Sequence, residues 1–350
     1  MTDRIKIAVL GASGYTGADL VRLAARHPNI EIAALTANTH AGKPMASVFP
    51  HLSILALPNL VEWETVDWSG IDAVFCGLPH GTTQKITAAL LSDNPQIKII
   101  DMSADFRIRD PEVYAEWYGH EHFAPTLQQE AVYGLTEFYR NQIKSARLVA
   151  CPGCYPTAAL LALLPAVAEG LVDPTDIIVD AKSGVSGAGR GLKQNTLFCE
   201  SGEGLSPYSI ASHRHAPEIE QEVGRAVGMQ LLINFTPHLI PMSRGELCTS
   251  YLRLKPGASV TALREAMKTR YQDEEFVQVL DEGIMPQTQN VRGSNYVQIG
   301  VFADRIRERA IVISTLDNLV KGSAGQALQN MNLVFGFDET AGLTQLPLFP

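Results

Sequence analysis

The chain has few cysteines, no excess of positive charge and no long apolar run, and each shortage excludes a class of protein. Its 350 residues hold five cysteines at scattered positions, which does not suit a disulfide framework and indicates a reducing, cytoplasmic setting. The formal net charge of −9 and the absence of a Lys/Arg run argue against nucleic acid as a partner. The longest apolar stretch, residues 158–168, contains Pro165 and is too short to span a bilayer, so no membrane partner is expected.

What the chain does have is a regular alternation of apolar segments over its first 150 residues. Strands are expected at residues 5–10, 30–35, 73–75 and 97–100, with a helix at residues 18–26. Strands separated by helices predict a parallel sheet with right-handed crossovers.

The pattern changes from Cys151 onward. Helices are expected at residues 157–169 and 317–335, and strands at residues 177–181, 247–254, 297–303 and 310–315. The later strands are longer and alternate in polarity, which predicts an α+β domain with a mixed or antiparallel sheet covered by helices on one face.

A glycine-rich segment follows the first expected strand. It comprises Gly11, Ser13, Gly14, Tyr15, Thr16 and Gly17, with the glycines spaced as GxxGxxG. Glycines at such a turn let the backbone approach a pyrophosphate, and the helix that follows supplies N–H donors and the positive end of its dipole. A turn that merely contains glycines is the alternative, but the strand–loop–helix context favours a nucleotide site in a Rossmann-like domain.

The end of the second expected strand carries no acidic residue. Enzymes that use NAD usually place Asp or Glu there, against the ribose hydroxyls. This chain has Thr36 and Asn38, with Lys43 shortly after. These groups tolerate a 2′-phosphate that a carboxylate would repel, so NADP(H) is the expected cofactor, although a solvated polar loop would look the same.

Cys154 lies where the long Ala/Leu helix is expected to begin. Unpaired N–H groups at a helix N-terminus favour the thiolate and could also hold an oxyanion. Three other interpretations compete. The CxxC spacing of Cys151 and Cys154 resembles a thioredoxin motif, a zinc site would need further ligands, and a single cysteine is most often buried and structural. Two prolines and a glycine around Cys154 favour an exposed, shaped turn.

Six segments, in order along nearly the whole chain, resemble the N-acetyl-gamma-glutamyl-phosphate reductase family. They are Ser-Ala-Asp-Phe-Arg at 103–107, Pro-Gly-Cys-Tyr-Pro-Thr at 152–157, Ser-Gly-Val-Ser-Gly-Ala-Gly-Arg at 183–190, His-Arg-His-Ala-Pro-Glu at 213–218, Phe-Thr-Pro-His at 235–238 and Asp-Asn-Leu-Val-Lys-Gly at 317–322. Cys151 and the tail from residue 337 lie outside these patterns. The resemblance implies a fold like that of semialdehyde dehydrogenases, NADPH-dependent reduction of an acyl phosphate with release of phosphate, and a place in arginine biosynthesis.

The resemblance also implies that Cys154 attacks the acyl phosphate and forms a thioester, which hydride transfer then reduces to the semialdehyde. A base must take the thiol proton and later return a proton. His215 is the first choice, with His213 as the alternative and Glu218 as a group that orients an imidazole or meets a substrate amide. His238 is expected in a turn with a structural role.

Further residues are expected around the substrate and the cofactor. Substrate contacts are predicted for Ser103, Arg107 and Arg190, with Lys193 as another anion candidate, and cofactor contacts for Ser183, Gly184, Asn318 and Lys321. Arg107 would grip phosphate with two hydrogen bonds, whereas a surface salt bridge is its alternative role. The expected domains are 1–150 for the cofactor, completed by the helical return 317–350, and 151–316 for catalysis and oligomerisation.

Two alternatives to this function stay open at this point. Aspartate-semialdehyde dehydrogenase shares the chemistry and the general plan, and a non-catalytic NADP-sensing module would need no nucleophile. No metal is expected. The protein is expected to act as a homo-oligomer, either a dimer or a tetramer.

Overall fold

The chain forms two compact units in the computed structural model, which describes residues 4–350. The first unit contains Met1–Pro152 and Ser323–Thr344, and the second contains Gly153–Gly322 and Gln345–Pro350. The expected return of residues 317–350 to the first unit is therefore wrong at both ends. Residues 317–322 and the last six residues belong to the second unit.

The first unit is built on a seven-stranded, all-parallel sheet. The strands are β1 (Ile5–Leu10), β2 (Ile30–Thr36), β3 (Leu60–Val61), β4 (Ala73–Cys76), β5 (Lys98–Asp101), β6 (Val132–Tyr133) and β7 (Leu148–Ala150), in the order β3-β2-β1-β4-β5-β7-β6. The predicted parallel sheet is confirmed. The two- and three-residue strands β3, β6 and β7 were not predicted, because segments so short carry no periodic pattern.

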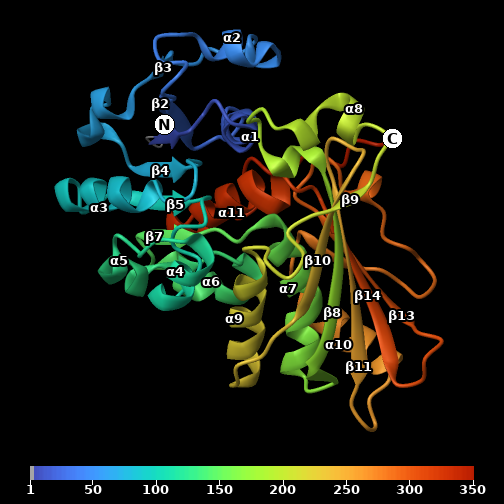
Figure 1. Cartoon of the computed structure of the whole chain (residues 1–350). Helices are drawn as coiled ribbons and strands as arrows, with labels where there is room; N and C mark the ends of the chain where they lie inside the picture. The colour runs from blue at the N-terminus through green and yellow to red at the C-terminus, as the bar shows by residue number, and fades with distance from the viewer. Residues whose placement is uncertain (1–3) are drawn as a thin grey trace. The chain divides into compact units, whose positions relative to one another are not determined.

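Helices cover this sheet on both faces, as Figure 1 shows for the blue-to-green part of the chain. They are α1 (Tyr15–Ala24), α2 (Met45–Val48), α3 (Thr83–Asp93), α4 (Pro111–Tyr118), α5 (Pro125–Glu130), α6 (Thr136–Lys144) and α11 (Gly325–Val334), with short 3-10 turns at Pro50–Leu52, Trp63–Thr65 and Trp68–Gly70. Ala8 and Leu10 of β1 pack in one core cluster with Leu90 of α3, while α11 contacts α1, α6 and β5. Since successive side chains of a strand point to opposite faces, β1 is buried on both, as parallel sheets require.

The second unit is built on a seven-stranded mixed sheet, as predicted. Its strands are β8 (Val172–Gly184), β9 (Ser206–Pro207), β10 (Asn234–Ile240), β11 (Glu246–Leu254), β12 (Val277–Val279), β13 (Val297–Ala303) and β14 (Arg309–Leu316), in the order β12-β13-β14-β11-β8-β10-β9. The expected turn at His238 is wrong. His238 lies inside β10, where it is paired with Lys182 of β8.

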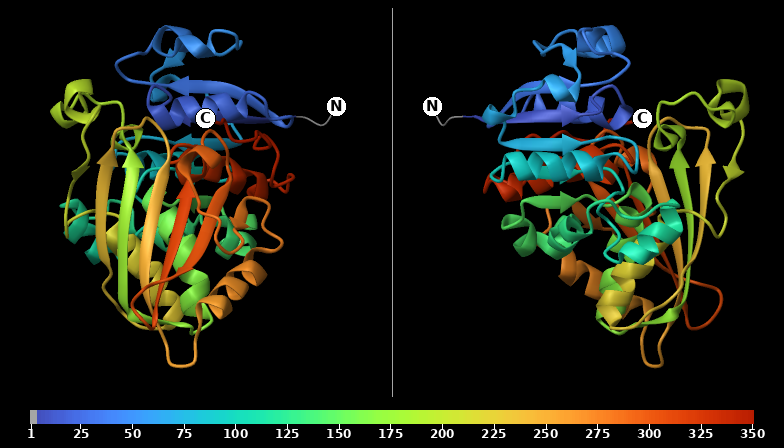
Figure 2. Two further views of the ribbon diagram at one scale, coloured as in Figure 1. Left: turned by 90° about the vertical axis from the view of Figure 1, so that its right-hand side faces the viewer. Right: turned by 60° about the vertical axis from the view of Figure 1, so that its left-hand side comes forward.

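Three long helices of this unit lie on one face of the mixed sheet. The helices are α7 (Cys154–Ala168), α8 (Phe198–Ser201), α9 (Ala216–Val227) and α10 (Val260–Tyr271), with 3-10 turns at Val185–Ala188, Gln194–Thr196 and Thr288–Asn290 and a π-helical turn at Val320–Ala324. Helix α7 packs on β8, β11 and β14 and lies between α9 and α10, which explains its continuous Ala/Leu sequence. The left view of Figure 2 shows the other face of this sheet, which no helix of the described part of this unit crosses. Among residues 4–350, no helix has the length and apolar content that a membrane crossing needs.

Candidate functional site

The glycine-rich loop of the first unit leaves no room for side chains where a ligand's phosphates would have to approach. Gly11 has a φ of +76°, and a Cβ on it would lie 2.5 Å from the carbonyl oxygen of Gly77. A Cβ on Gly17 would lie 2.6 Å from the carbonyl oxygen of Gly11. Helix α1 begins at Tyr15, and no side chain caps it at Gly14. The loop thus offers close backbone approach and uncapped helix N–H groups, the two features that hold a pyrophosphate.

The edge beside this loop, after β2, is polar and free of carboxylates. The carbonyl oxygen of Thr36 accepts a hydrogen bond from the Ala12 N–H at 2.9 Å, which joins the end of β2 to the loop. The Thr36 side chain is buried, whereas Asn38 and Lys43 are exposed. The exposed groups can meet an anionic substituent on a ribose, while Thr36 acts through its backbone.

The carboxyl end of β5 holds two of the predicted substrate residues in a buried polar network. The Ser103 hydroxyl donates to the Asp101 carboxylate at 2.9 Å and accepts from the Asp105 N–H at 3.1 Å. Burial, reinforced by the charge of Asp105, raises the pKa of Asp101 to about 7. The Arg107 guanidinium is buried and donates to the carbonyl oxygens of Cys151 at 2.7 Å and Met102 at 2.9 Å. Ser103 and Arg107 therefore shape the segment that precedes Cys154, and substrate binding by either stays a prediction.

Cys151 is a buried thiol of the first unit. Burial raises its pKa to about 12, and the Asn330 side-chain amide donates to its sulfur at 3.6 Å. All five cysteines are free thiols. A thiol that stays protonated is a poor redox partner, so the structure does not favour a Cys151–Cys154 redox pair.

Cys154 is the first residue of α7, as the sequence predicts. Gly153 precedes it in extended conformation, and no side chain caps the helix there. The thiol is partly exposed. A Cβ on Gly322 would lie 2.8 Å from the Cys154 Cβ, so the glycine at the end of the 317–322 motif makes room for this cysteine. The helix N–H groups face the position from which the sulfur would attack a carbonyl.

His215 and Glu218 both lie against the residue before Cys154. A Cβ on Gly153 would be 2.4 Å from His215 Nε2, so the imidazole lies directly on this glycine. The fully buried Glu218 carboxylate accepts a hydrogen bond from the Gly153 N–H at 2.9 Å. The structure thus brings Cys154, His215 and Glu218 together within the second unit. Glu218 orients the backbone that carries the nucleophile.

His213 is held in an aromatic cage. Its ring makes edge contacts with Tyr155, Tyr208 and Phe235, with centroid distances of 5.2 to 5.7 Å. Its Nδ1 accepts a hydrogen bond from the His215 N–H at 3.1 Å. Burial, followed by the charge of Arg214, lowers the pKa of His213 to about 4. His213 is therefore neutral near pH 7 and fixes the position of its neighbour.

The predicted cofactor residues of the second unit form a network between loops. Asn318 accepts from the Gly245 N–H and donates to the Ser186 hydroxyl, both at 2.9 Å. The Gly184 N–H donates to the Gly245 carbonyl oxygen at 2.9 Å, and a Cβ on Gly184 would lie 2.8 Å from the carbonyl oxygen of Ser243. Ser183 is buried beside them. These contacts keep residues 317–322 with the second unit, and cofactor binding by them stays a prediction.

Three predicted cations are placed differently from one another. Lys321 is fully buried, with its ammonium 5.9 Å from the centroid of the Phe276 ring. Arg190 and Lys193 are exposed in the loop after β8, where the Lys193 ammonium donates to the Ala188 carbonyl oxygen at 3.3 Å. Their exposure suits an anion that approaches from solvent.

Sequence reasoning missed one carboxylate next to the nucleophile. Glu246, the first residue of β11, is fully buried, and the Cys154 thiol donates a hydrogen bond to its carboxylate. Burial raises the pKa of Glu246 to about 8. The available signal was a lone acid at the start of an apolar strand, which by itself does not say what the acid faces.

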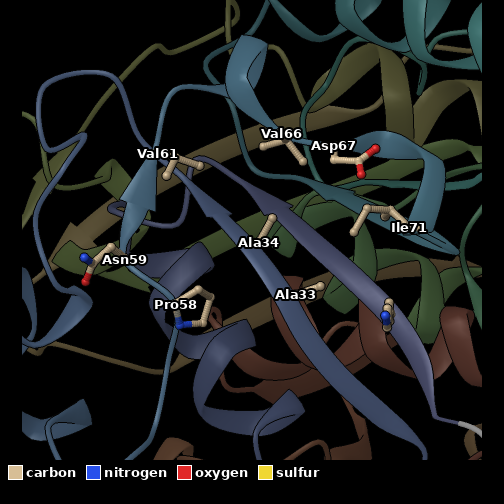
Figure 3. A pocket seen from close by; sticks show the side chains of 10 residues that line it. Ala33, Ala34, Pro58, Asn59, Val61, Val66, Asp67 and Ile71 are labelled. Atoms are coloured by element: carbon tan, nitrogen blue, oxygen red, sulfur yellow. The ribbon is translucent and has the colours of Figure 1, made fainter.

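A surface hollow of about 320 Å³ lies elsewhere in the first unit, along β2 and the segment that follows β3 (Figure 3). Ala33, Ala34, Val61, Val66 and Ile71 supply most of its apolar lining. In the described part of the chain, the residues that line it include none of the predicted site residues. The hollow is therefore separate from the chemistry described above.

Comparison with known proteins matches both units to one family. Residues 6–146 match the model of the semialdehyde dehydrogenase NAD binding domain, and residues 154–318 match that of the semialdehyde dehydrogenase dimerisation domain. An N-acetyl-gamma-glutamyl-phosphate reductase of Rhodospirillum rubrum is 58% identical over the whole of both chains. A probable chloroplastic N-acetyl-gamma-glutamyl-phosphate reductase of Arabidopsis thaliana is 54% identical, over 99% of this chain and 86% of the relative.

Solved structures share the fold at much lower identity. Aspartate semialdehyde dehydrogenase II from Vibrio cholerae superposes with a TM-score of 0.73, covering 95% of this chain and 99% of that one at 16% identity. Aspartate semialdehyde dehydrogenase from Candida albicans, solved with NADP, has a TM-score of 0.67 at 17% identity, covering 95% of this chain and 99% of that one. At such identity the likeness establishes the fold alone.

Proposed function

Because the chain belongs to the N-acetyl-gamma-glutamyl-phosphate reductase family, we propose that it reduces N-acetyl-gamma-glutamyl phosphate to N-acetylglutamate semialdehyde, releasing phosphate. The observation that carries the proposal is Cys154 at the uncapped start of α7, with His215 against the preceding glycine. Attack by the thiolate on the acyl phosphate gives a thioester, which divides one difficult reduction into two easier steps. The reaction serves arginine biosynthesis, and a cytoplasmic setting is part of the proposal.

The residues of the first unit fit a nicotinamide dinucleotide. A cradle in which a Cβ on Gly11 would lie 2.5 Å from backbone suits a pyrophosphate, and the uncapped N-terminus of α1 suits its charge. When bound, the cofactor supplies the hydride that reduces the thioester. Gly11, Ser13, Gly14 and Thr16 would hold its phosphates, and Asn38 and Lys43 would meet a 2′-phosphate. We propose NADP(H) as the preferred form.

We assign acid–base work at the reacting centre to His215. It lies beside the nucleophile, whereas burial keeps His213 neutral and caged. The α7 N–H groups would stabilise the oxyanion that forms when sulfur attacks the carbonyl. Arg190 and Lys193 are the proposed first contacts of the substrate's phosphate, since both are exposed. A homo-oligomer completes the proposal, because the second unit matches a dimerisation domain and leaves one sheet face without helices.

The reverse reaction tests this function. Enzyme, NADP⁺ and N-acetylglutamate semialdehyde should produce NADPH only when phosphate or arsenate is added, because an oxyanion must cleave the thioester. Aspartate semialdehyde serves as the matched substrate control and should be a poor substrate. Steady NADPH production without either oxyanion would mean that water cleaves the thioester, and the proposed reductase would instead be an ordinary aldehyde dehydrogenase.

A further inference from the structure

Glu246 is placed by the sheet so that its carboxylate meets the nucleophile. It begins β11 and is paired with Ser183 of β8 on one side and with Leu316 of β14 on the other. Helix α7 packs on these same strands, and its first residue is Cys154. The Cys154 thiol donates its hydrogen bond to Glu246. Among the described residues, no other polar group comes within hydrogen-bonding distance of either Glu246 oxygen.

The ionisable groups around this carboxylate offer it little support as an anion. Asp317 raises its pKa further, beyond the larger effect of burial. The phenols of Tyr155 and Tyr208 and the thiol of Cys248 also face Glu246, and burial raises the pKa of each. The nearby Arg244 guanidinium lies 3.3 Å from Asp317 and offsets that carboxylate instead. A buried carboxyl in such surroundings readily takes up a proton, and the thiol is its nearest source.

We propose that Glu246 is a catalytic residue, which takes the proton of the Cys154 thiol when the sulfur attacks and returns it when the sulfur leaves. The inference rests on the proposed thioester function and divides the proton transfers between two residues. Glu246 serves the sulfur. His215 then serves the oxygen atoms of the substrate.

The acylation step balances with these two residues. The thiol proton moves from Sγ to a carboxylate oxygen of Glu246 as the sulfur electron pair forms the bond to the acyl carbon. The bond between that carbon and the phosphate oxygen breaks, its electron pair stays on the oxygen, and the departing phosphate takes one proton from His215. When sulfur later leaves as the thiolate, the Glu246 carboxylic acid gives its proton back, and solvent reloads His215.

A carboxyl and a thiol that share a proton titrate as a pair. The rate at which iodoacetamide alkylates Cys154, read by peptide mass spectrometry, should therefore rise with pH in two steps in the wild type. E246Q should show a single step and reach its full rate at lower pH, because no carboxylate charge opposes the thiolate. The exposed Cys199, measured in the same samples, should give one unchanged step in both proteins. The kcat/KM of E246Q for reduction should fall by about 10²-fold, as lost acid–base catalysis does.

Glu137→Gln is the matched control, since Glu137 is a buried carboxylate of the first unit. E137Q should keep the two-step profile and the wild-type kcat/KM. If the profiles of E246Q and wild type superimpose, Glu246 does not share the thiol proton and the proposal is overturned. If circular dichroism shows that E246Q does not fold, H215A decides, because two steps would support the Glu246 pair and one step would overturn it. Failure of the thioester function would show separately, as a wild-type enzyme that forms no acyl-enzyme.

Discussion

Two histidines only two positions apart differ in their surroundings, and this difference sets their chemistry. Three aromatic rings enclose His213, and burial lowers its pKa to about 4. A base with so low a pKa holds almost no proton near pH 7 and cannot act as an acid there. His215 lies instead on Gly153, beside the nucleophile. The spacing of the two residues is visible in the sequence, but the aromatic cage is not, because its members come from three separate segments.

Replacing His215 with Ala should lower kcat by about 10²–10⁴, the usual loss when general acid–base catalysis is removed. H213A should cost less, because it removes packing and one hydrogen bond to the His215 backbone. Steady-state reduction of the acyl phosphate measures both variants. The opposite order of effects would show that His213 carries the proton.

The raised pKa of Glu246 predicts how stability depends on pH. An unfolded glutamate ionises near pH 4.3, whereas Glu246 in the fold ionises at about 8, so the folded state binds more protons between these values. Its contribution is present at low pH and is lost as the pH rises through this window. E246Q should therefore gain on the wild type by about 1.4 kcal/mol per pH unit across the window. Urea unfolding at pH 5 and pH 8 measures the difference, and a constant difference would contradict the raised pKa.

At the scale of elements, the strand–loop–helix segment at residues 5–24 is the part that the sequence predicts best. Glycine spacing predicts the turn, and the structure supplies the reason for each glycine. Gly11 has φ +76° and backbone within 2.5 Å of where a Cβ would be. Such a position accepts no other residue without displacement of the loop.

Gly11→Ala should weaken NADPH binding by roughly tenfold or more, because the loop must move to admit the methyl group. Gly70→Ala is the matched control, since nothing lies within 4 Å of the site of its Cβ. Fluorescence titration with NADPH compares the two variants. Equal affinities would show that this loop does not hold the cofactor.

The end of β2 predicts a preference for NADPH over NADH. Exposed Asn38 and Lys43 and the absence of a carboxylate between them suit a 2′-phosphate. Charge-assisted hydrogen bonds of about 1.5–3 kcal/mol imply a preference of roughly tenfold or more in kcat/KM. The ratio should fall in K43A, and equal kcat/KM for the two cofactors in the wild type would contradict the prediction.

Sequence patterns predicted long elements and missed short or atypical ones, for physical reasons. The strand expected at residues 297–303 is β13 (Val297–Ala303), and β1 also has its expected ends. Strands β3, β6 and β7 have two or three residues, which is too few for an alternation to be visible. Pro237 disguised β10 as a turn, although a proline is tolerated in that strand.

At the scale of the whole molecule, the order of strands in the second sheet decides what the nucleophile meets. Glu246 reaches Cys154 because β11 lies between β8 and β14 and α7 packs across all three. No local pattern contains that order, since the four elements are spread over more than 150 residues. The same limit applies to the unit boundary. The contacts of Asn318 with Gly245 and Ser186 keep residues 317–322 in the second unit, although a helix was expected to begin at residue 317.

The most direct test of the thioester on Cys154 is intact-mass and peptide mass spectrometry after mixing with N-acetyl-gamma-glutamyl phosphate in the absence of NADPH. The wild type should gain one acyl group, located on Cys154 and removed by hydroxylamine. Cys154→Ser should gain none and should lose reduction, because a serine hydroxyl is hardly ionised near neutral pH, while it should still bind NADPH. Cys151→Ser is the matched control and should acylate like the wild type, since Cys151 is buried and its pKa is about 12. Acylation of C154S, or loss of acylation in C151S together with a reversible Cys151–Cys154 disulfide in active wild type, would contradict the thioester mechanism.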